Sequence, residues 1–215
     1  VARFHAESER AQTLAPHPNL IPVVAFGEAE GLHYRASDYV EAKSLADFIR
    51  PGRLAPKKCL EVCAAAAEGL SYLHSLGMVH RDVKPSNSLV QIGFAKLIGT
   101  PAYVSPEQAR GELEQISTAS DVYSLGATIF RALTGRYPFA FNAYTRTIQA
   151  IAIGPAPQLV ALRPDAPASL NALVLGAMAQ DPGARPSAAQ FASDLRGLLQ
   201  VERFLMPPAP PGAAV

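Results

Sequence analysis

Beyond about residue 40, apolar residues recur mainly at helical spacing. Three stretches each place their apolar side chains on one helical face: Leu60 to Leu73, Leu170 to Met178 and Phe191 to Leu199. Ser187, followed three residues later by Gln190, predicts a capping box at the start of the last helix. The pattern therefore predicts a mainly helical body for the larger part of the chain.

The first forty residues follow a different pattern. Apolar residues set among charged ones predict a short amphipathic helix over residues 3–14, which Pro16 ends. Residues 20–26 are apolar and β-branched, residues 27–31 supply a turn, and residues 32–40 alternate loosely, which predicts a β-hairpin. The expected fold class is α+β, with a small strand-bearing part ahead of the helices.

Composition narrows the possible functions. The 215 residues are 49% hydrophobic and 17% charged, with a net charge of +1, which excludes disorder as the main state and gives no general attraction for nucleic acid or anionic membrane. No apolar run approaches the roughly 18 residues that a membrane-spanning helix needs. The only cysteines, Cys59 and Cys63, fit small core residues and a reducing, cytoplasmic location better than a disulfide framework or a four-ligand zinc site.

One segment carries several chemically useful groups close together. Residues 80–87 read His-Arg-Asp-Val-Lys-Pro-Ser-Asn, and Pro85 keeps them from continuing as an ordinary helix. Asp82 could accept a hydroxyl proton, Lys84 could hold a migrating phosphoryl group, and Asn87 could supply an oxygen ligand to Mg²⁺. For the bare His-Arg-Asp triplet, a solvated charged loop is the competing interpretation.

Together with four further segments, this loop resembles the protein kinases, and specifically the bacterial-type serine/threonine kinases. The further segments, in the family's order, are Gly-Thr-Pro-Ala-Tyr-Val-Ser-Pro-Glu at 99–107, Asp-Val-Tyr-Ser-Leu-Gly at 121–126, Leu-Thr-Gly-Arg-Tyr-Pro-Phe at 133–139, and Asp-Pro through Arg-Pro at 181–186. The resemblance covers nearly the whole chain. Small-molecule kinases of related fold fit less well, because they usually have glycine where Arg81 stands and lack the Lys-Pro pair.

The resemblance implies a two-lobe fold with a truncated small lobe. Residues 1–40 would be a remnant of the N-lobe, residues 41–205 the mainly helical C-lobe, and residues 206–215 a flexible proline-rich tail. The implied reaction transfers the γ-phosphoryl group of ATP to Ser or Thr hydroxyls of protein substrates. Asp82 would orient and deprotonate the hydroxyl, Lys84 would steady the phosphoryl group, and Asn87 would hold Mg²⁺.

The nucleotide site is also implied by the resemblance. Adenine would contact the backbone of the segment between the lobes, at Asp38 and Val40, and Ser44 falls at the ribose position. An ordinary edge strand and turn is the alternative for this segment. Glu7 matches the helical glutamate that pairs with a strand lysine in the family, although a solvated helix face would explain it equally well.

Four supporting residues complete the implied site. Glu107 and Arg185 match the family's buried ion pair, which ties the activation segment to the helical lobe. Asp121 matches the helix carboxylate that accepts hydrogen bonds from the catalytic-loop backbone, or it is a helix N-cap. Arg81 matches the arginine that reads a phosphate on the activation loop in many relatives.

The sequence departs from the family pattern in three places. The Gly-rich loop and the strand lysine would precede the first residue. Five residues, 88–92, stand where relatives have two strands and an Asp-Phe-Gly, and Leu97 and Ile98 alone separate Lys96 from Gly99. These departures predict weak nucleotide binding. Either the residues are omitted from the sequence, or the gene has lost them and encodes a pseudokinase scaffold that binds partner proteins; a non-specific helical interaction domain would require the motifs to be accidental.

Overall fold

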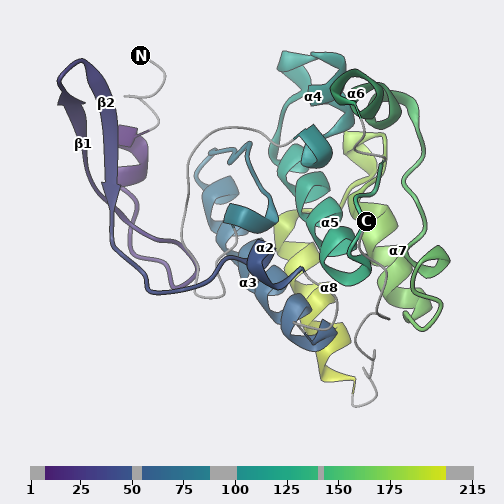
Figure 1. Cartoon of the computed structure of the whole chain (residues 1–215). Helices are drawn as coiled ribbons and strands as arrows, with labels where there is room; N and C mark the ends of the chain where they lie inside the picture. Colours follow the sequence, from purple (N-terminus) through teal and green to yellow (C-terminus); the bar gives the residue numbers. More distant parts are fainter. Residues whose placement is uncertain (1–7, 50–54, 88–100, 140–142, 202–215) are drawn as a thin grey trace.

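The computed structural model describes residues 8–49, 55–87, 101–139 and 143–201 (Figure 1). The small sheet consists of β1 (Val23–Ala29) and β2 (Leu32–Ser37). The helices are α2 (Leu45–Phe48), α3 (Pro56–Ser75), α4 (Pro106–Arg110), α5 (Thr118–Thr134), α6 (Tyr144–Ile153), α7 (Ala168–Ala177) and α8 (Ala188–Gln200). A further helical turn covers residues 8–12. Glu7 and the proline-rich tail lie outside the described residues.

Four of the described helices, α2, α3, α7 and α8, pack against α5, which is buried on nearly every face. α3 lies along α8 and against α5, and α7 packs on another side of α5. The β-hairpin stands at one side of this helical body and is joined to it by the connections before β1 and after β2 (Figure 1). This arrangement agrees with the predicted α+β class and its small strand-bearing part. Among the described residues, no helix is both long enough and apolar enough to span a membrane.

The hairpin forms as predicted, but its turn is shorter than predicted. β1 and β2 are antiparallel, and Glu30 (φ 52°) and Gly31 (φ 74°) alone make the turn, so residues 27–29 belong to β1. Gly27 pairs with Tyr34, and a Cβ at Gly27 would lie 3.0 Å from the Tyr34 hydroxyl oxygen. The glycine is therefore a strand residue that makes room for a cross-strand ring, and not a turn residue.

The three helices predicted for the helical body are confirmed, and their apolar faces are the buried ones. In α3, for example, Leu60, Cys63 and Leu70 are buried, and both cysteines are free thiols in the core. At the start of α8 the Ser187 hydroxyl accepts a hydrogen bond from the backbone N–H of Gln190, at 3.1 Å. The reciprocal half of the predicted capping box does not form, and the Gln190 amide nitrogen instead donates to an Asp194 carboxylate oxygen at 2.8 Å.

α5 and α7 approach closely because one residue between them has no side chain. A Cβ placed on Gly126 would lie 2.9 Å from the Ala177 Cβ and 2.9 Å from the Met178 Cγ. Both of these neighbours are buried, so neither can move into solvent to relieve the overlap. Gly126 therefore sets the distance between α5 and the end of α7.

We predict that Gly126→Ala lowers the free energy of unfolding by about 1–3 kcal/mol, because the added methyl group overpacks this contact. The matched control is Gly197→Ala in α8, where a Cβ would have no heavy atom within 4 Å. There the same change should raise stability by about 0.5–1 kcal/mol through helix propensity. Urea denaturation of both variants measures the difference, and equal stability of the two would contradict the close approach.

Candidate active site

The candidate catalytic loop leaves α3 and ends in a single 3₁₀ turn. After α3 ends, Gly77 takes a positive φ of 70°, which turns the chain away from the helix axis. Residues 79–84 are neither helix nor strand, and Pro85–Asn87 form the 3₁₀ turn. The backbone N–H of Asn87 donates to the Lys84 carbonyl at 3.0 Å, so this turn brings position 87 back toward the residues before it.

The turn brings three functional side chains of the loop together. The Lys84 ammonium donates to Asp82 Oδ1 at 2.9 Å, and the Asn87 amide nitrogen donates to Asp82 Oδ2 at 2.8 Å. The same amide nitrogen also donates to the Asp82 backbone carbonyl at 2.7 Å. The Lys84 side chain is only 7% exposed and that of Asp82 is 20% exposed. The carboxylate is thus held at both oxygens while part of it stays open to solvent.

A buried carboxylate on α5 anchors the loop from behind. Asp121 Oδ2 accepts from the backbone N–H of His80 at 2.8 Å, and Oδ1 accepts from that of Arg81 at 2.7 Å. Arg81 adopts a positive φ of 66°, a conformation that a non-glycine residue keeps only where its surroundings enforce it. The competing interpretation of Asp121 as an N-cap is wrong, because Ser117 is the N-cap of α5.

Two histidines complete this anchor. His74, near the end of α3, contacts Asp121 Oδ2 through its Nε2 at 2.8 Å. The backbone N–H of Asp82 donates to His80 Nδ1 at 3.2 Å. Burial lowers the pKa of His80, although the carboxylates of Asp121 and Asp82 act in the opposite direction. A neutral His80 ring can accept at Nδ1, so the lowered pKa and the hydrogen bond agree.

Sequence reasoning did not single out His74. It lies outside the motif, six residues before His80 on a helix whose apolar face draws attention to other positions. Its position in the last turn of α3 could have indicated this contact, because a side chain there can reach a residue on a helix that packs against α3, here α5.

The expected ion pair between Glu107 and Arg185 is present and buried. Two guanidinium nitrogens of Arg185 donate to the two carboxylate oxygens of Glu107 at 2.8 Å each, and both side chains are 0% exposed. The Ser120 hydroxyl also donates to Glu107, at 2.6 Å. Burial alone would raise the pKa of Glu107, but the hydrogen bonds from Arg185 and Ser120 outweigh it and lower the pKa to about 2.

Two of the residues expected to contact the nucleotide line a cavity that Asp82 does not line, and the third caps a short helix that packs against the 3₁₀ turn of the catalytic loop. Asp38 and Val40 line a cavity of about 800 Å³ between the hairpin connections, α3 and α8, and Asp82 is not among its lining residues. Ser44 is the N-cap of α2, and its hydroxyl donates to Asp47 Oδ2 at 2.7 Å. Glu7 lies outside the described residues. The described part of the chain contains no group of three or more His, Cys, Asp or Glu side chains that could hold a metal ion.

Comparison with known families identifies the fold. The family model for the protein kinase domain matches residues 2–98 and, in a second match, residues 90–194. The chain belongs to the protein kinase family. The two matches meet at residues 90–98, the stretch in which the sequence has neither an Asp-Phe-Gly nor an activation loop of the expected length.

Among curated kinases, the chain is 34% identical to serine/threonine-protein kinase PknB of Mycolicibacterium smegmatis over 238 residues, covering 97% of this chain and 37% of that protein. It is 30% identical to serine/threonine-protein kinase PrkC of Bacillus subtilis over 231 residues, covering 95% of this chain and 35% of PrkC. These alignments are longer than the 215 residues of the chain, so some positions of the relatives have no counterpart here. The resemblance to bacterial serine/threonine kinases is confirmed, and the chain spans little more than a third of these relatives.

The fold is also that of a solved kinase. The structure of Rad53 residues 1–466 in complex with AMP-PNP superposes with a TM-score of 0.75 at 24% sequence identity, covering 90% of this chain and 54% of Rad53. At this identity the likeness supports the kinase fold alone. Together with the family match, it confirms the predicted kinase-like architecture with a reduced small lobe.

We predict that Arg185→Met lowers the free energy of unfolding by about 3–5 kcal/mol, because it leaves the Glu107 carboxylate buried without its partner. The double variant Arg185→Met/Glu107→Leu should regain most of this loss, since no buried charge then remains. Chemical denaturation of both proteins measures the difference. A double variant as unstable as the single one would show that packing around Arg185, and not the unpaired charge, is responsible.

The lowered pKa of Glu107 also predicts a pH dependence of stability. Because its folded-state pKa is about 2 against an ordinary value of 4.5, the stabilisation is fully present above about pH 4.5 and is lost as the pH falls toward 2. The shift corresponds to about 3 kcal/mol. Urea midpoints measured between pH 6 and pH 2.5 should fall more steeply for the parent chain than for Glu107→Gln, and parallel curves would refute this role of Glu107.

Proposed function

We propose that this chain is a serine/threonine protein kinase domain that transfers the γ-phosphoryl group of ATP to Ser or Thr hydroxyls of protein substrates. The observation that carries the proposal is the arrangement of Asp82, Lys84 and Asn87, which places a carboxylate, an ammonium and a carboxamide within hydrogen-bonding distance of one another. The names of the bacterial relatives support the same reaction class. A cytoplasmic location remains a prediction.

Asp82 would act as the base of this reaction. The substrate hydroxyl oxygen forms a bond to the γ-phosphorus while the bond from that phosphorus to the bridging oxygen of ADP breaks, and the hydroxyl proton passes to the Asp82 carboxylate. Lys84 and Asn87 each hold one carboxylate oxygen, so the orientation of the base is established before substrate arrives. Such positioning supplies much of the catalysis in phosphoryl transfer.

Lys84 would neutralise charge on the transferred group. Its ammonium lies 2.9 Å from Asp82 Oδ1, so a phosphoryl oxygen near the base would also lie near this cation. Because the lysine side chain is only 7% exposed, its charge is less screened by water than that of a surface lysine. The ammonium would therefore favour the approach of an anionic phosphoryl group to the carboxylate.

Among the described residues of the loop, the Asn87 side chain offers one possible oxygen ligand for Mg²⁺. The Asn87 amide nitrogen is engaged with Asp82, which leaves the amide oxygen as the atom of this side chain suited to a cation. Mg²⁺ usually takes one or two carboxylates together with phosphate oxygens, and the described residues offer no cluster of carboxylates for it. The described residues therefore do not make a complete magnesium site, and no step above depends on the ion.

The proposal also includes the division of the chain into lobes and the residues that would contact the nucleotide. Residues 1–40 would form the N-lobe remnant, residues 41–205 the C-lobe, and residues 206–215 the tail. The backbone of Asp38 and Val40 would contact adenine, with Ser44 near the ribose, and Glu7 would take the position of the family's helical glutamate. The hairpin ends at Ser37 and the next helix, α2, begins at Leu45, which supports a lobe boundary between them.

A second candidate function is a pseudokinase scaffold that binds partner proteins without catalysis. The specific observation in its favour is the family match in two pieces, which meet where the sequence lacks an Asp-Phe-Gly. Such a scaffold would keep the helical lobe and lose nucleotide binding. The two functions thus differ in whether ATP stabilises the chain.

We predict that Asp82→Asn lowers phosphate transfer from γ-labelled ATP to a protein substrate by about 100-fold or more, because the amide cannot accept the hydroxyl proton. Asp194→Asn on α8 is the matched control and should leave the rate unchanged, since Asp194 contacts only Gln190 among the hydrogen bonds described. An Asp82→Asn variant with the parent's turnover would exclude Asp82 as the base.

Thermal unfolding with ATP and Mg²⁺ distinguishes the two functions. A ligand present at 100 times its dissociation constant raises stability by about 2.7 kcal/mol, which is readily measured as a rise in Tm. No rise at millimolar nucleotide, together with no phosphate transfer by the parent chain, would refute the kinase proposal and leave the scaffold.

A further inference from the structure

A groove lies on the side of the molecule where the hairpin joins the helices. It has a volume of about 800 Å³, and its walls come from residues 18–22 before β1, Asp38 and Val40 after β2, the first half of α3, and the last turns of α8. Ile21, Val40, Val62 and Leu199 are among its apolar lining residues, and lysines of α3 and Arg196 are among the charged ones. The groove is therefore amphipathic. No residue of the loop 80–87 lines it, whereas Asp38 and Val40, whose backbone is proposed above to contact adenine, do.

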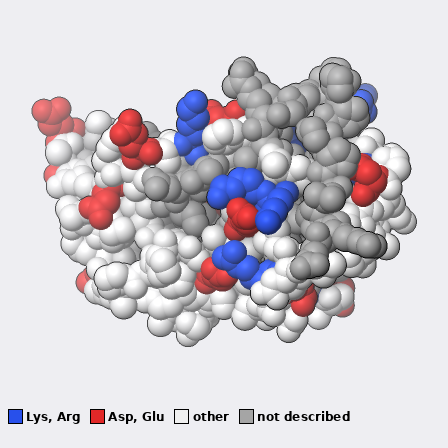
Figure 2. Space-filling model, turned by 90° about the horizontal axis from the view of Figure 1, so that it is seen from below, with Lys and Arg blue, Asp and Glu red and all other residues white. Residues whose placement is uncertain are grey.

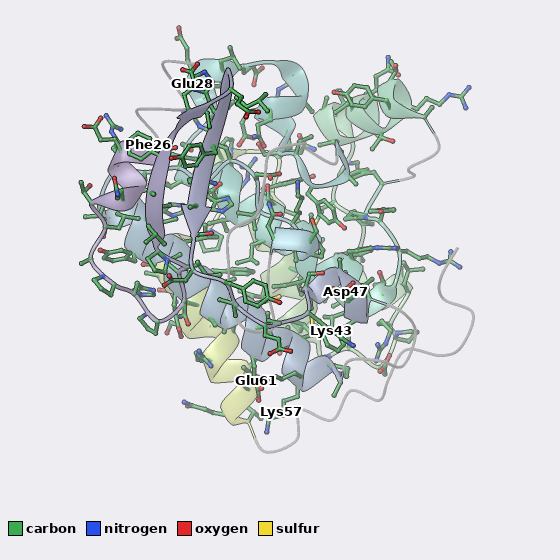
Figure 3. All side chains as sticks on the ribbon, turned by 60° about the vertical axis from the view of Figure 1, so that its left-hand side comes forward. Phe26, Glu28, Lys43, Asp47, Lys57 and Glu61 are labelled. Carbon is green, nitrogen blue, oxygen red and sulfur yellow. The ribbon has the colours of Figure 1, made fainter. Side chains whose placement is uncertain are left out.

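The charged residues lie at the exposed ends of the two helices. Lys57 and Glu61 are on the first turns of α3, well below the hairpin that carries Phe26 and Glu28 (Figure 3). Seen from below, side chains of both signs lie next to one another near the middle of the face (Figure 2). Lys58 contacts Glu61 at 3.3 Å, so part of this charge is already neutralised within the chain.

Hydrogen bonds hold the walls of the groove together. On α3, Glu68 accepts from the Asn19 amide at 2.8 Å through one carboxylate oxygen and from Arg196 Nε at 2.8 Å through the other. The pKa of Glu68 is lowered chiefly by the hydrogen bond from Arg196, so the carboxylate is charged at neutral pH. His17 stacks on Tyr72 of α3 with ring centroids 4.9 Å apart. One side of the groove is therefore built before any ligand binds.

Both chain connections to the hairpin line this groove. Residues 18–22 lead into β1, and Asp38 and Val40 follow β2. A segment bound in the groove would contact both connections and the helices at the same time. It would therefore restrict movement of the hairpin relative to the helical body, because such movement would break contacts on one side.

We propose that the segment following α8, residues 202–206, folds back and docks in this groove. Its sequence is Glu-Arg-Phe-Leu-Met, and the apolar side chains of Phe204, Leu205 and Met206 match the apolar lining. α8 forms one wall with Leu199 and Gln200, so the chain leaves the helix directly beside the groove. Phe204 lies three positions after Val201, a reach of about 10 Å.

Attachment makes this occupant favourable without high intrinsic affinity. A segment joined to the wall of its own binding site has an effective local concentration in the millimolar range, which a separate peptide rarely reaches. The proline-rich sequence that begins at Pro207 also limits how far a helix could continue beyond the apolar triplet. The docked segment would connect the C-terminal end of the domain to the position of the hairpin.

Photo-crosslinking of the full chain tests this proposal. The photoreactive residue benzoylphenylalanine replaces Phe204 in a mixture of isotope-labelled and unlabelled chains, and mass spectrometry identifies the crosslinked peptides. We expect crosslinks within one chain to residues 18–22 or 57–65. Crosslinks between labelled and unlabelled chains would assign the segment to a second copy, while crosslinks only elsewhere, or none, would also overturn the proposal. The same photoreactive residue at Leu113, which is 76% exposed and outside the groove, gives the background.

Two variants test whether the groove itself is the site. Ala65→Arg places a long side chain in the groove and should lower the crosslink yield about tenfold, the effect of about 1.4 kcal/mol of docking free energy. Ala189→Arg makes the same change on the exposed surface of α8 and should leave the yield unchanged. Leu205→Asp changes only the segment, so it remains informative if Ala65→Arg fails to fold. Crosslinking that survives both Ala65→Arg and Leu205→Asp would refute docking in this groove.

Discussion

The catalytic loop depends on one buried carboxylate. Asp121, on the central helix α5, accepts the backbone N–H groups of His80 and Arg81. Those two donors would otherwise need water or other partners, and a buried backbone donor without one costs about 1–3 kcal/mol. The same contacts offset the unfavourable positive φ of Arg81, which turns the chain just before Asp82. The orientation of Asp82 thus follows from a helix some forty residues later in the chain.

A second buried carboxylate connects distant parts of the same lobe. Glu107 at the start of α4 binds Arg185 beyond α7, and Arg185 also donates to the Ala179 and Ala119 carbonyls at 2.8 and 3.0 Å. Ser120 contacts Glu107 from the turn of α5 that also carries Asp121. Because Ser120, which donates to Glu107, and Asp121, which accepts from the loop, are adjacent residues of α5, the loop and the segment around α4 share a common support.

Sequence reasoning succeeded where periodicity or a long motif determined the result. The buried face of α3 and the Glu107–Arg185 pair were both expected, and both are present. The sequence-based prediction was wrong where a glycine fits more than one local structure. Gly27 was assigned to the turn, but it is a strand residue paired with Tyr34. Neither the His74 contact nor the groove could be predicted, because each depends on how separate helices pack.

The contacts that hold the catalytic loop lie within the loop itself and on α5. Asp82, Lys84 and Asn87 are held by one another and, through Asp121, by α5, whereas nucleotide binding in the family also draws on an Asp-Phe-Gly. The sequence has no Asp-Phe-Gly between Asn87 and Gly93, and none of the contacts just named depends on one. The contacts of the catalytic loop therefore agree with the proposed kinase reaction. Whether the chain is active depends on whether it binds ATP.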